Sequence, residues 1–280
     1  MENCISLKEK VRSPVVGDMF YPEDRAGIEA QFRAWGLERL TGGRASAIIA
    51  PHGAWGISGR ITADAFSAAG GRQGRDSIDR VFILGPIHQG TEEGIFLSDS
   101  DFFETPLGPL AVDHETGTEL ASCSTLFEVN DIPHLREHSI EVLLPFIKYC
   151  FPQASIVPVL MGSARRPLVS ALARALEIAA APVMANSLCV VSCNLAMNPS
   201  ASLARTQAEE CVKLLMKKEP SAFNEGLEDG RISTCGGGIV ASLLESGLVA
   251  KNEARLISKP LISARGEDNE TIYYGALSYE

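Results

Sequence analysis

Several features that mark common protein classes are scarce in this chain of 280 residues. Lys and Arg number 25 against 35 Asp and Glu, and no cluster of Lys and Arg appears. Because a nucleic-acid protein needs a basic patch to neutralise phosphates, the formal net charge of −10 argues against nucleic acid as a partner. No uninterrupted apolar run reaches the roughly 18 residues of a membrane span, and the N-terminal stretch lacks the apolar core of a signal peptide. We therefore expect a cytoplasmic protein that binds no membrane.

Cysteine patterns that would bind zinc or exchange disulfides are also missing. The seven cysteines are irregularly spaced and include no Cys-x-x-Cys pair, which removes the zinc-ribbon and thioredoxin interpretations. An odd, irregular set is typical of a reduced compartment, where most cysteines are small buried hydrophobes. The five histidines are few enough to consider singly: His52, His88, His114, His134 and His138.

Apolar runs and amphipathic patterns alternate along the chain. The runs that we expect to be strands are nearly continuous in apolar character and span residues 46–51, 81–86, 156–161 and 188–193. The patterns that we expect to be helices span residues 24–35, 61–69, 133–150, 166–180 and 200–217. This alternation predicts an α/β fold with a mostly parallel central sheet flanked by helices.

Shorter segments complete the predicted fold. Residues 94–98 and 109–112 flank a turn with Pro and Gly and predict a hairpin insertion, and Thr271–Tyr279 predicts a last strand at an edge of the sheet. The Gly-rich loop at residues 70–75 is too short to separate domains. We expect residues 1–280 to form one domain.

Polar side chains follow three predicted strands directly. His52 follows residues 46–51, His88 follows residues 81–86, and Asn194 follows residues 188–193. Ligands of open α/β sheets bind beyond the carboxyl ends of the strands, so two histidines at equivalent places indicate a metal pair or an acid and a base. The alternative is that each histidine only caps a loop.

Cys235 is the third candidate, because it precedes three glycines and a predicted helix at Gly237–Glu245. The positive end of the helix dipole is expected to lower the pKa of its thiol. A thiolate with two imidazoles suits iron, copper or zinc. The alternative is a buried cysteine where a helix begins.

The segment DIPHLREHS contains the pattern H-x-x-E-H of one class of zinc hydrolases. On a helix, His134 and His138 would share one face, with Glu137 beside them. A further acidic ligand downstream is missing, so the alternative is an amphipathic helix with a solvent-facing His134 and with His138 at the edge of a pocket.

An ordered set of motifs resembles the Memo-like family, the Memo component of the AmmeMemoRadiSam system. The motifs are RSPVVGDMFYP, IIAPHGAWGISG, ILGPIHQG, ETPLGPLAVD, EHSIEVLLPF, VVSCN, CGGG and YYGALSY. The resemblance implies a fold like that of the class III extradiol ring-cleaving dioxygenases. It implies metal ligands at His52, His88 and Cys235, with Fe(II) as the expected ion and Cu or Zn as alternatives. It also suggests a radical-SAM protein of the same system as a partner.

The chain departs from the family pattern near one motif. Asn194 and Met197 stand where the family has an Asp and a His, and methionine can neither take nor give a proton. We therefore do not expect ordinary extradiol dioxygenase activity. Trp55 is expected to form an apolar wall of the pocket, and His138 and Glu141 to orient the site.

Two functions stay open on these grounds. One is a redox or oxygen-dependent role of a bound metal, acting on an unidentified small molecule or peptide. The other is a non-catalytic module that binds a peptide or small ligand beside a degenerate metal site.

Overall fold

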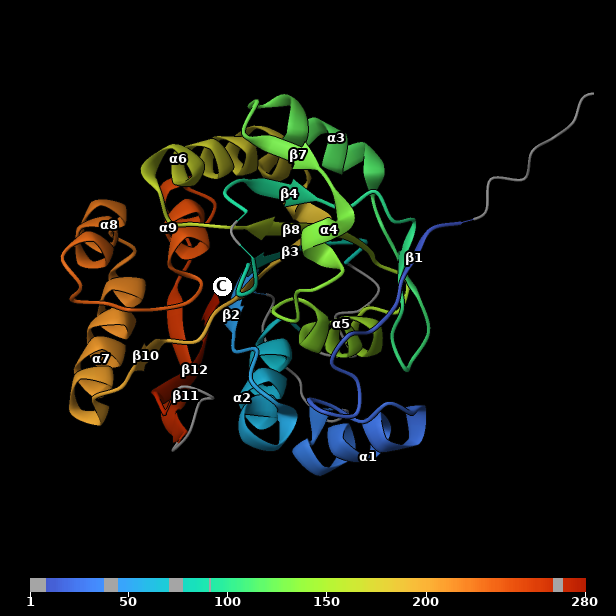
Figure 1. Cartoon of the computed structure of the whole chain (residues 1–280), viewed down its shortest axis with the longest axis horizontal. Coiled ribbons are helices and arrows are strands. Elements are labelled where there is room, and N and C mark those ends of the chain that lie inside the picture. The colour runs from blue at the N-terminus through green and yellow to red at the C-terminus, as the bar shows by residue number, and fades with distance from the viewer. Residues whose placement is uncertain (1–8, 38–44, 71–77, 91, 264–268) are drawn as a thin grey trace, which may run out of the picture.

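The computed structural model describes residues 9–37, 45–70, 78–90, 92–263 and 269–280. Its main feature is a nine-stranded mixed sheet between two layers of helices (Figure 1). The strand order is β10 (Ala196–Asn198), β12 (Thr271–Tyr279), β2 (Ala47–Ala50), β9 (Ser187–Ser192), β3 (Arg80–Pro86), β8 (Ser155–Met161), β4 (Ile95–Leu97) and β7 (Phe127–Val129). The remaining strand, β11 (Ala254–Ser263), pairs with β12.

The four central strands, β2, β9, β3 and β8, are parallel, as their continuous apolar character predicts. On either side the sheet turns antiparallel, where β12 meets β2 and β4 meets β8. The predicted α/β class is therefore confirmed, with a parallel centre and mixed flanks.

Successive residues of the central strands pack into two separate cores on opposite faces of the sheet. One core includes Ile49, Phe82, Val157 and Val191. The other includes Ile48, Ile83, Ile156 and Val190. Because both faces are apolar, each needs its own layer of helices.

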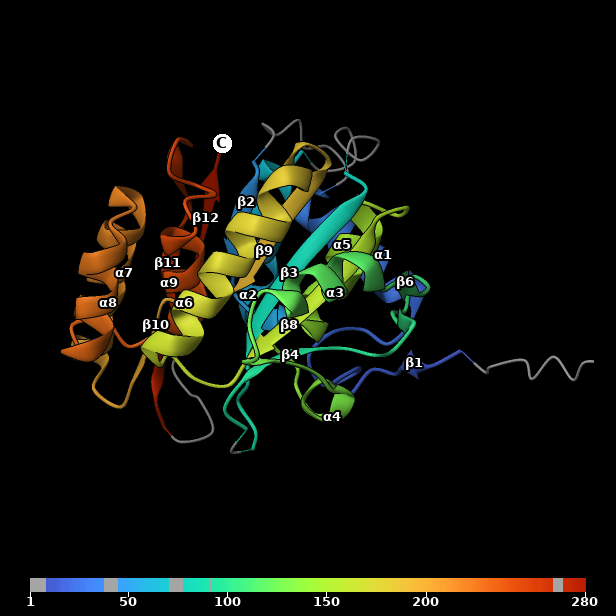
Figure 2. The same cartoon turned by 90° about the horizontal axis from the view of Figure 1, so that it is seen from above.

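One helical layer covers the core that includes Ile48, and it contains α1 (Arg25–Trp35), α2 (Trp55–Ala68) and α5 (Leu144–Cys150). The other face is covered by α3 (His114–Ser122), α6 (Arg166–Ala175), α7 (Ala201–Lys217) and α9 (Gly237–Glu245). Figures 1 and 2 both place α7 and α8 (Pro220–Glu228) together at one end of the molecule, beside β10, β11 and β12. Local sequence sets these bounds: Asp24 caps α1 through the amide of Gly27, and Gly36 ends it at φ 73°.

Two predicted strand arrangements are wrong. Residues 94–98 and 109–112 do not form a hairpin, because β4 joins the main sheet while β6 (Leu110–Ala111) pairs with β5 (Phe102–Phe103) in a small separate sheet with β1 (Val11–Arg12). Thr271–Tyr279 is not an edge strand, since β2 lies on one side of it and β11 on the other. A run of apolar residues reports burial but not which strand becomes the neighbour.

The predicted helix over residues 133–150 is also wrong. The chain forms the short helix α4 (Asp131–His134), then a turn, a 3-10 turn at Glu141–Leu143 and the helix α5. Pro145 at the start of α5 suits a new helix better than the interior of a long one, because proline lacks an amide hydrogen. Residues 71–75 of the predicted loop at 70–75 lie outside the described residues.

One helical stretch, Arg166–Asn186, has the length and hydropathy of a membrane span over its 21 residues. Half of its apolar window is buried, and Leu168, Val169 and Leu172 pack in the core. Charged residues interrupt the stretch, which is why a search for uninterrupted apolar runs does not find it. The buried side chains of the stretch make it part of the core on that face of the sheet.

Candidate metal centre

Three residues far apart in the sequence bring potential ligand atoms together. His52 follows β2, His88 follows β3 and Cys235 precedes α9, and their ligand atoms lie within 4.8 Å of one another. The ring centroids of the two histidines are 4.9 Å apart, and Cys235 Sγ lies 3.3 Å from His52 Nε2. Strand β9 separates β2 from β3, so the two side chains meet across its carboxyl end.

A relay of two serines sets the orientation of the His52 ring. The Ser192 hydroxyl donates to the carbonyl of Ser139, so its oxygen is left to accept from His52 Nδ1 at 2.7 Å. This network assigns the proton to Nδ1 and leaves the Nε2 lone pair facing Cys235. Burial, and then the neighbouring His88 and His138, lower the pKa of His52 well below its usual value, so the ring stays neutral as a metal ligand must.

The carboxylate of Glu137 holds His88 in the same way. It accepts from the backbone amide of His88 and from His88 Nδ1, the latter at 3.0 Å. A carboxylate only accepts, so Nδ1 donates and Nε2 is left for the site. Burial alone would raise the pKa of Glu137, but the hydrogen bonds that it accepts from His88 outweigh burial and lower this pKa to about 2. The amides of His138 and Ser139 also donate to Glu137 Oε1.

Cys235 sits one residue before the N-cap of α9, as predicted. The backbone amide of Asn194 donates to its sulfur at 3.3 Å. The expected lowering of its pKa by the helix dipole is overridden. A hydrogen bond with Cys193, together with burial, raises the pKa of the Cys235 thiol, and the same hydrogen bond lowers the pKa of Cys193. A bound cation would stabilise the thiolate form of Cys235 and so oppose this rise in its pKa.

The other predicted pocket residues fall into two groups, and two members of the first group, Asn194 and His138, border the site. Asn194 Oδ1 accepts from the backbone amide of His52 at 3.2 Å. The ring of His138 lies 5.0 Å from that of His88 and 5.9 Å from that of His52. Met197 lies further along in β10, where its amide donates to the carbonyl of Ser233.

The second group, Trp55 and Glu141, is engaged elsewhere. Trp55 is buried in an aromatic core, with its ring 4.7 Å from that of Phe146 and its indole nitrogen bonded to the carbonyl of Val142. The carboxylate of Glu141 accepts from Arg12 and from the Tyr21 hydroxyl. Both residues support the elements around the centre, and neither lies among the three candidate ligands.

The H-x-x-E-H segment does not build a zinc pair. Its predicted solvent-facing His134 is 1% exposed, and its Nε2 bonds to the carbonyl of Phe96 at 3.2 Å. Since α4 ends at His134, the two histidines do not share a helix face. Glu137 and His138 do form a second cluster with His88, but the Glu137 carboxylate is already used by His88 and by backbone amides.

Sequence reasoning missed Ser192, Ser139 and Cys193, and it gave Glu137 another role. Serines that end strands are common and carry no distinctive pattern. The position of Ser192 two residues before Asn194, and therefore at the carboxyl end of β9, is the signal that could have found it.

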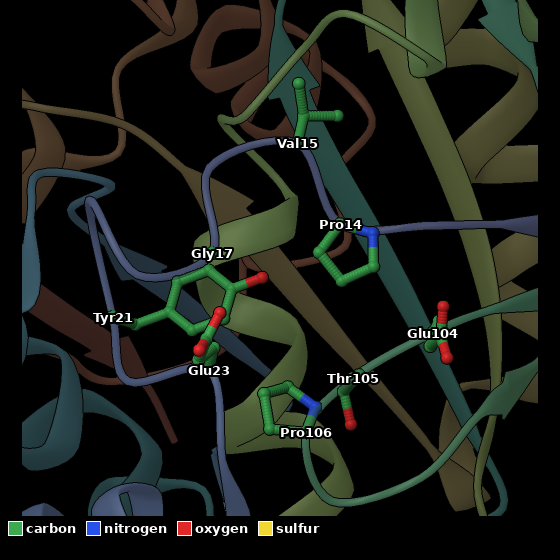
Figure 3. Close-up of a pocket in the computed structure, with 8 residues that line it drawn as sticks. All are labelled: Pro14, Val15, Gly17, Tyr21, Glu23, Glu104, Thr105 and Pro106. Atoms are coloured by element: carbon green, nitrogen blue, oxygen red, sulfur yellow. The ribbon is translucent and has the colours of Figure 1, made fainter.

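Two hollows lie in the described part of the chain near these elements. A small cavity of about 70 Å³ borders Cys235, between the ends of β3 and β8 and the start of α9. A larger one of about 350 Å³ lies between the N-terminal segment and the loop Glu104, Thr105 and Pro106 (Figure 3). None of the residues lining the larger hollow belongs to the cluster of His52, His88 and Cys235.

Comparisons with known proteins find matches that cover most of the chain. Residues 12–275 match the family described as Memo-like protein. A MEMO1 family protein of Thermotoga neapolitana is 30% identical over 249 residues, covering 85% of this chain and 88% of that protein. One from Nitrosopumilus maritimus is 24% identical, covering 96% of this chain and 99% of its own length. Among solved structures, the uncharacterized protein JW3007 of Escherichia coli K12 aligns with 96% of this chain and 99% of its own, at 12% identity and a TM-score of 0.48.

Proposed function

The chain belongs to the Memo-like family, and we propose that it binds one transition-metal ion through His52, His88 and Cys235. The proposed ion is Fe(II), with Cu or Zn as alternatives. The proposed role is a redox or oxygen-dependent reaction on a small molecule or peptide. The first claim concerns binding and the second concerns chemistry, and they are tested in that order.

The observation that carries the proposal is the orientation of both imidazoles. Ser192 and Glu137 accept hydrogen bonds from Nδ1 of His52 and of His88, so both Nε2 lone pairs are available at one point. Partners of this kind fix the tautomer of metal-bound histidines and raise their basicity. Two histidines that only capped loops would not need separate buried acceptors behind their rings.

The residues present fit a metal ion of intermediate softness. Two neutral imidazoles and one cysteine sulfur suit Fe, Cu and Zn, and suit Mg or Ca poorly. Three protein ligands leave further coordination positions open, as catalytic rather than closed structural sites do. When bound, a redox-active ion would supply one-electron chemistry and a place for a small ligand.

The chain itself supplies hydrogen bonding and one place to hold a proton. Asn194 fixes the backbone of His52, and its amide side chain carries no charge. Met197 holds no proton, so the task of a base falls to His138, whose ring stacks on that of His88. Glu137 Oε1 lies 3.3 Å from His138 Nδ1 and would stabilise the protonated ring.

Metal content is the measurement that tests binding. Protein without a His-tag, purified without oxygen, is expected to contain iron or copper, or to take up one Fe(II), Cu(I) or Zn(II) per chain. Cys235→Ser and His88→Ala are each expected to lose tight binding. Cys123→Ser, a partly exposed cysteine at the end of α3, is the matched control and should bind like the parent.

Uptake that persists in His52→Ala and in His88→Ala would place the metal elsewhere and overturn the proposal. A folded parent protein that refuses all three ions would favour the non-catalytic binding module instead. Turnover is then tested with the loaded protein, where His138→Gln is expected to lower the rate more than it lowers metal affinity.

A further inference from the structure

A second cysteine, Cys193, lies beside Cys235, and metal binding as proposed does not require it. Thr234, the residue before Cys235, places its hydroxyl 2.8 Å from Cys193 Sγ. In return Asn194, the residue after Cys193, donates its amide to Cys235 Sγ. The end of β9 and the turn before α9 therefore run side by side at these sulfurs.

The two backbone segments are in close contact at this point. A Cβ added to Gly236 would lie 2.8 Å from the Cβ of Cys193 and 2.9 Å from its sulfur. Nothing larger than hydrogen thus fits between Cys193 and the residue after Cys235. Disulfides need Cβ atoms roughly 3.5–4.5 Å apart, a separation that backbones in this kind of contact can supply.

The two thiols differ in how easily a reagent reaches them. Cys235 is partly exposed and borders the cavity of about 70 Å³ at the start of α9. Cys193 is 0% exposed and lies behind it. A small oxidant from solvent therefore meets Cys235 first, and the product on that sulfur faces the second thiol.

We propose that Cys193 and Cys235 are a redox-active pair, which a hydroperoxide converts to an intramolecular disulfide that removes the Cys235 sulfur from the metal centre. The Cys235 sulfur attacks the hydroperoxide, the O–O bond breaks, and the products are a sulfenic acid and an alcohol, or water from hydrogen peroxide. Cys193 then attacks the Cys235 sulfur, the S–S bond forms, and the hydroxyl leaves as water with the proton of Cys193. Two thiols lose two electrons and two protons in total, and a dithiol reductant reverses the change by exchange.

The consequence for the metal rests on the proposed function. A disulfide sulfur carries no thiolate, so the oxidised centre keeps only His52 and His88. Metal binding and the disulfide then exclude each other. Peroxide would release the ion, and a dithiol would restore the site.

The test uses the full chain loaded with Zn(II), because zinc has no redox chemistry of its own. One equivalent of hydrogen peroxide is added, zinc release is followed with a coloured chelator, and the protein is digested without reduction for mass spectrometry. We expect zinc loss, a cross-linked peptide pair containing Cys193 and Cys235, and a chain lighter by about 2 Da, the mass of two hydrogens. Dithiothreitol should reverse all three changes.

Cys193→Ser separates the proposal from general oxidation. Without its partner, Cys235 should stop at the sulfenic acid with one equivalent of peroxide and form no cross-linked peptide. A second equivalent should carry it to the sulfinic acid, after which dithiothreitol should no longer restore zinc binding. Cys123→Ser should behave like the parent. Should Cys193→Ser fail to fold, Cys193→Ala serves, and the parent's cross-linked peptide is decisive in any case.

Other products overturn the proposal. These are a cross-link from either cysteine to the nearby Cys211, irreversible oxidation of Cys235 in the parent, or two thiols that remain reduced at full peroxide consumption. A parent protein that takes up no zinc contradicts the proposed metal function instead, and the peptide measurement still decides the disulfide.

Discussion

The guanidinium of Arg12 and the carboxylate of Glu141 form an ion pair at 2.5 Å with both side chains fully buried. The remaining donors of Arg12 bond to the carbonyls of His134 and Glu137, at 3.0 and 2.8 Å. The Glu137 carboxylate in turn holds His88. One arginine near the N-terminus thus fixes the backbone of the turn that orients a candidate metal ligand.

Arg12→Met should destabilise the protein strongly. It leaves the Glu141 carboxylate buried without its cation, a loss of about 3–5 kcal/mol for a broken buried pair. Urea unfolding at pH 7 measures the change. Arg255→Met removes an exposed partner of Glu280 and should cost at most about 1 kcal/mol. Equal effects of the two substitutions would contradict this account of Arg12.

Glu137→Gln should weaken metal binding while the fold persists. The amide nitrogen replaces one oxygen that accepts from His88 or from backbone amides, so the ring loses its fixed orientation. Loss of such a partner typically costs 10–100-fold in affinity, roughly, and Zn(II) titration calorimetry measures it. Glu128→Gln changes an exposed carboxylate, and its affinity for Zn(II) should equal that of the parent protein. Parent affinity in Glu137→Gln would show that His88 does not depend on Glu137.

His134 should make the protein less stable in mild acid. Burial lowers its pKa to about 3 in the folded state, against an ordinary value of 6.5. Between these values the unfolded chain binds a proton that the folded chain does not, so stability falls as pH drops below 6.5. The slope from this residue is up to about 1.4 kcal/mol per pH unit.

The measurement is urea unfolding from pH 7 to pH 4 on the parent and on His134→Gln, whose side chain can still donate toward Phe96. The variant should show a shallower loss than the parent over this range. His114→Gln, at an exposed histidine, should follow the parent curve. Parallel curves for the parent and His134→Gln would refute the assignment.

Two glycines in α2 should respond to alanine with opposite signs. A Cβ at Gly59 would lie 2.3 Å from the ring of Trp35, which packs against Trp55 and Phe146, so Gly59→Ala should cost about 1–3 kcal/mol. A Cβ at Gly56 meets nothing within 4 Å, so Gly56→Ala should gain up to about 1 kcal/mol from helix propensity. Thermal unfolding of both variants is the check, and a stabilised Gly59→Ala would show that Trp35 has room to move.

Much of the fold follows from local patterns. The four parallel strands and α9 lie close to their predicted positions, because continuous apolar runs need two covered faces and glycines mark the start of α9. The prediction of Thr271–Tyr279 as an edge strand is wrong, because β11 pairs with it. The sequence did not reveal β11 as a strand, since polar and charged residues stand among its apolar ones. Periodicity measures how buried a strand is, and pairing depends on partners that lie far away in the chain.

The site divides in the same way. The sequence by itself determined that His52, His88 and Cys235 are candidates, because each stands where a strand ends or a helix begins and such ends meet at one edge of a sheet. Only the tertiary structure decided which protons those rings carry and which side chains support them. The supporting contacts join residues that lie 41 to 140 positions apart in the sequence, and they involve Ser192, Glu137 and Cys193. The motifs assigned Trp55 and Glu141 to the pocket. In the structure Trp55 packs in the aromatic core and Glu141 pairs with Arg12, because a buried polar group needs a hydrogen-bond partner.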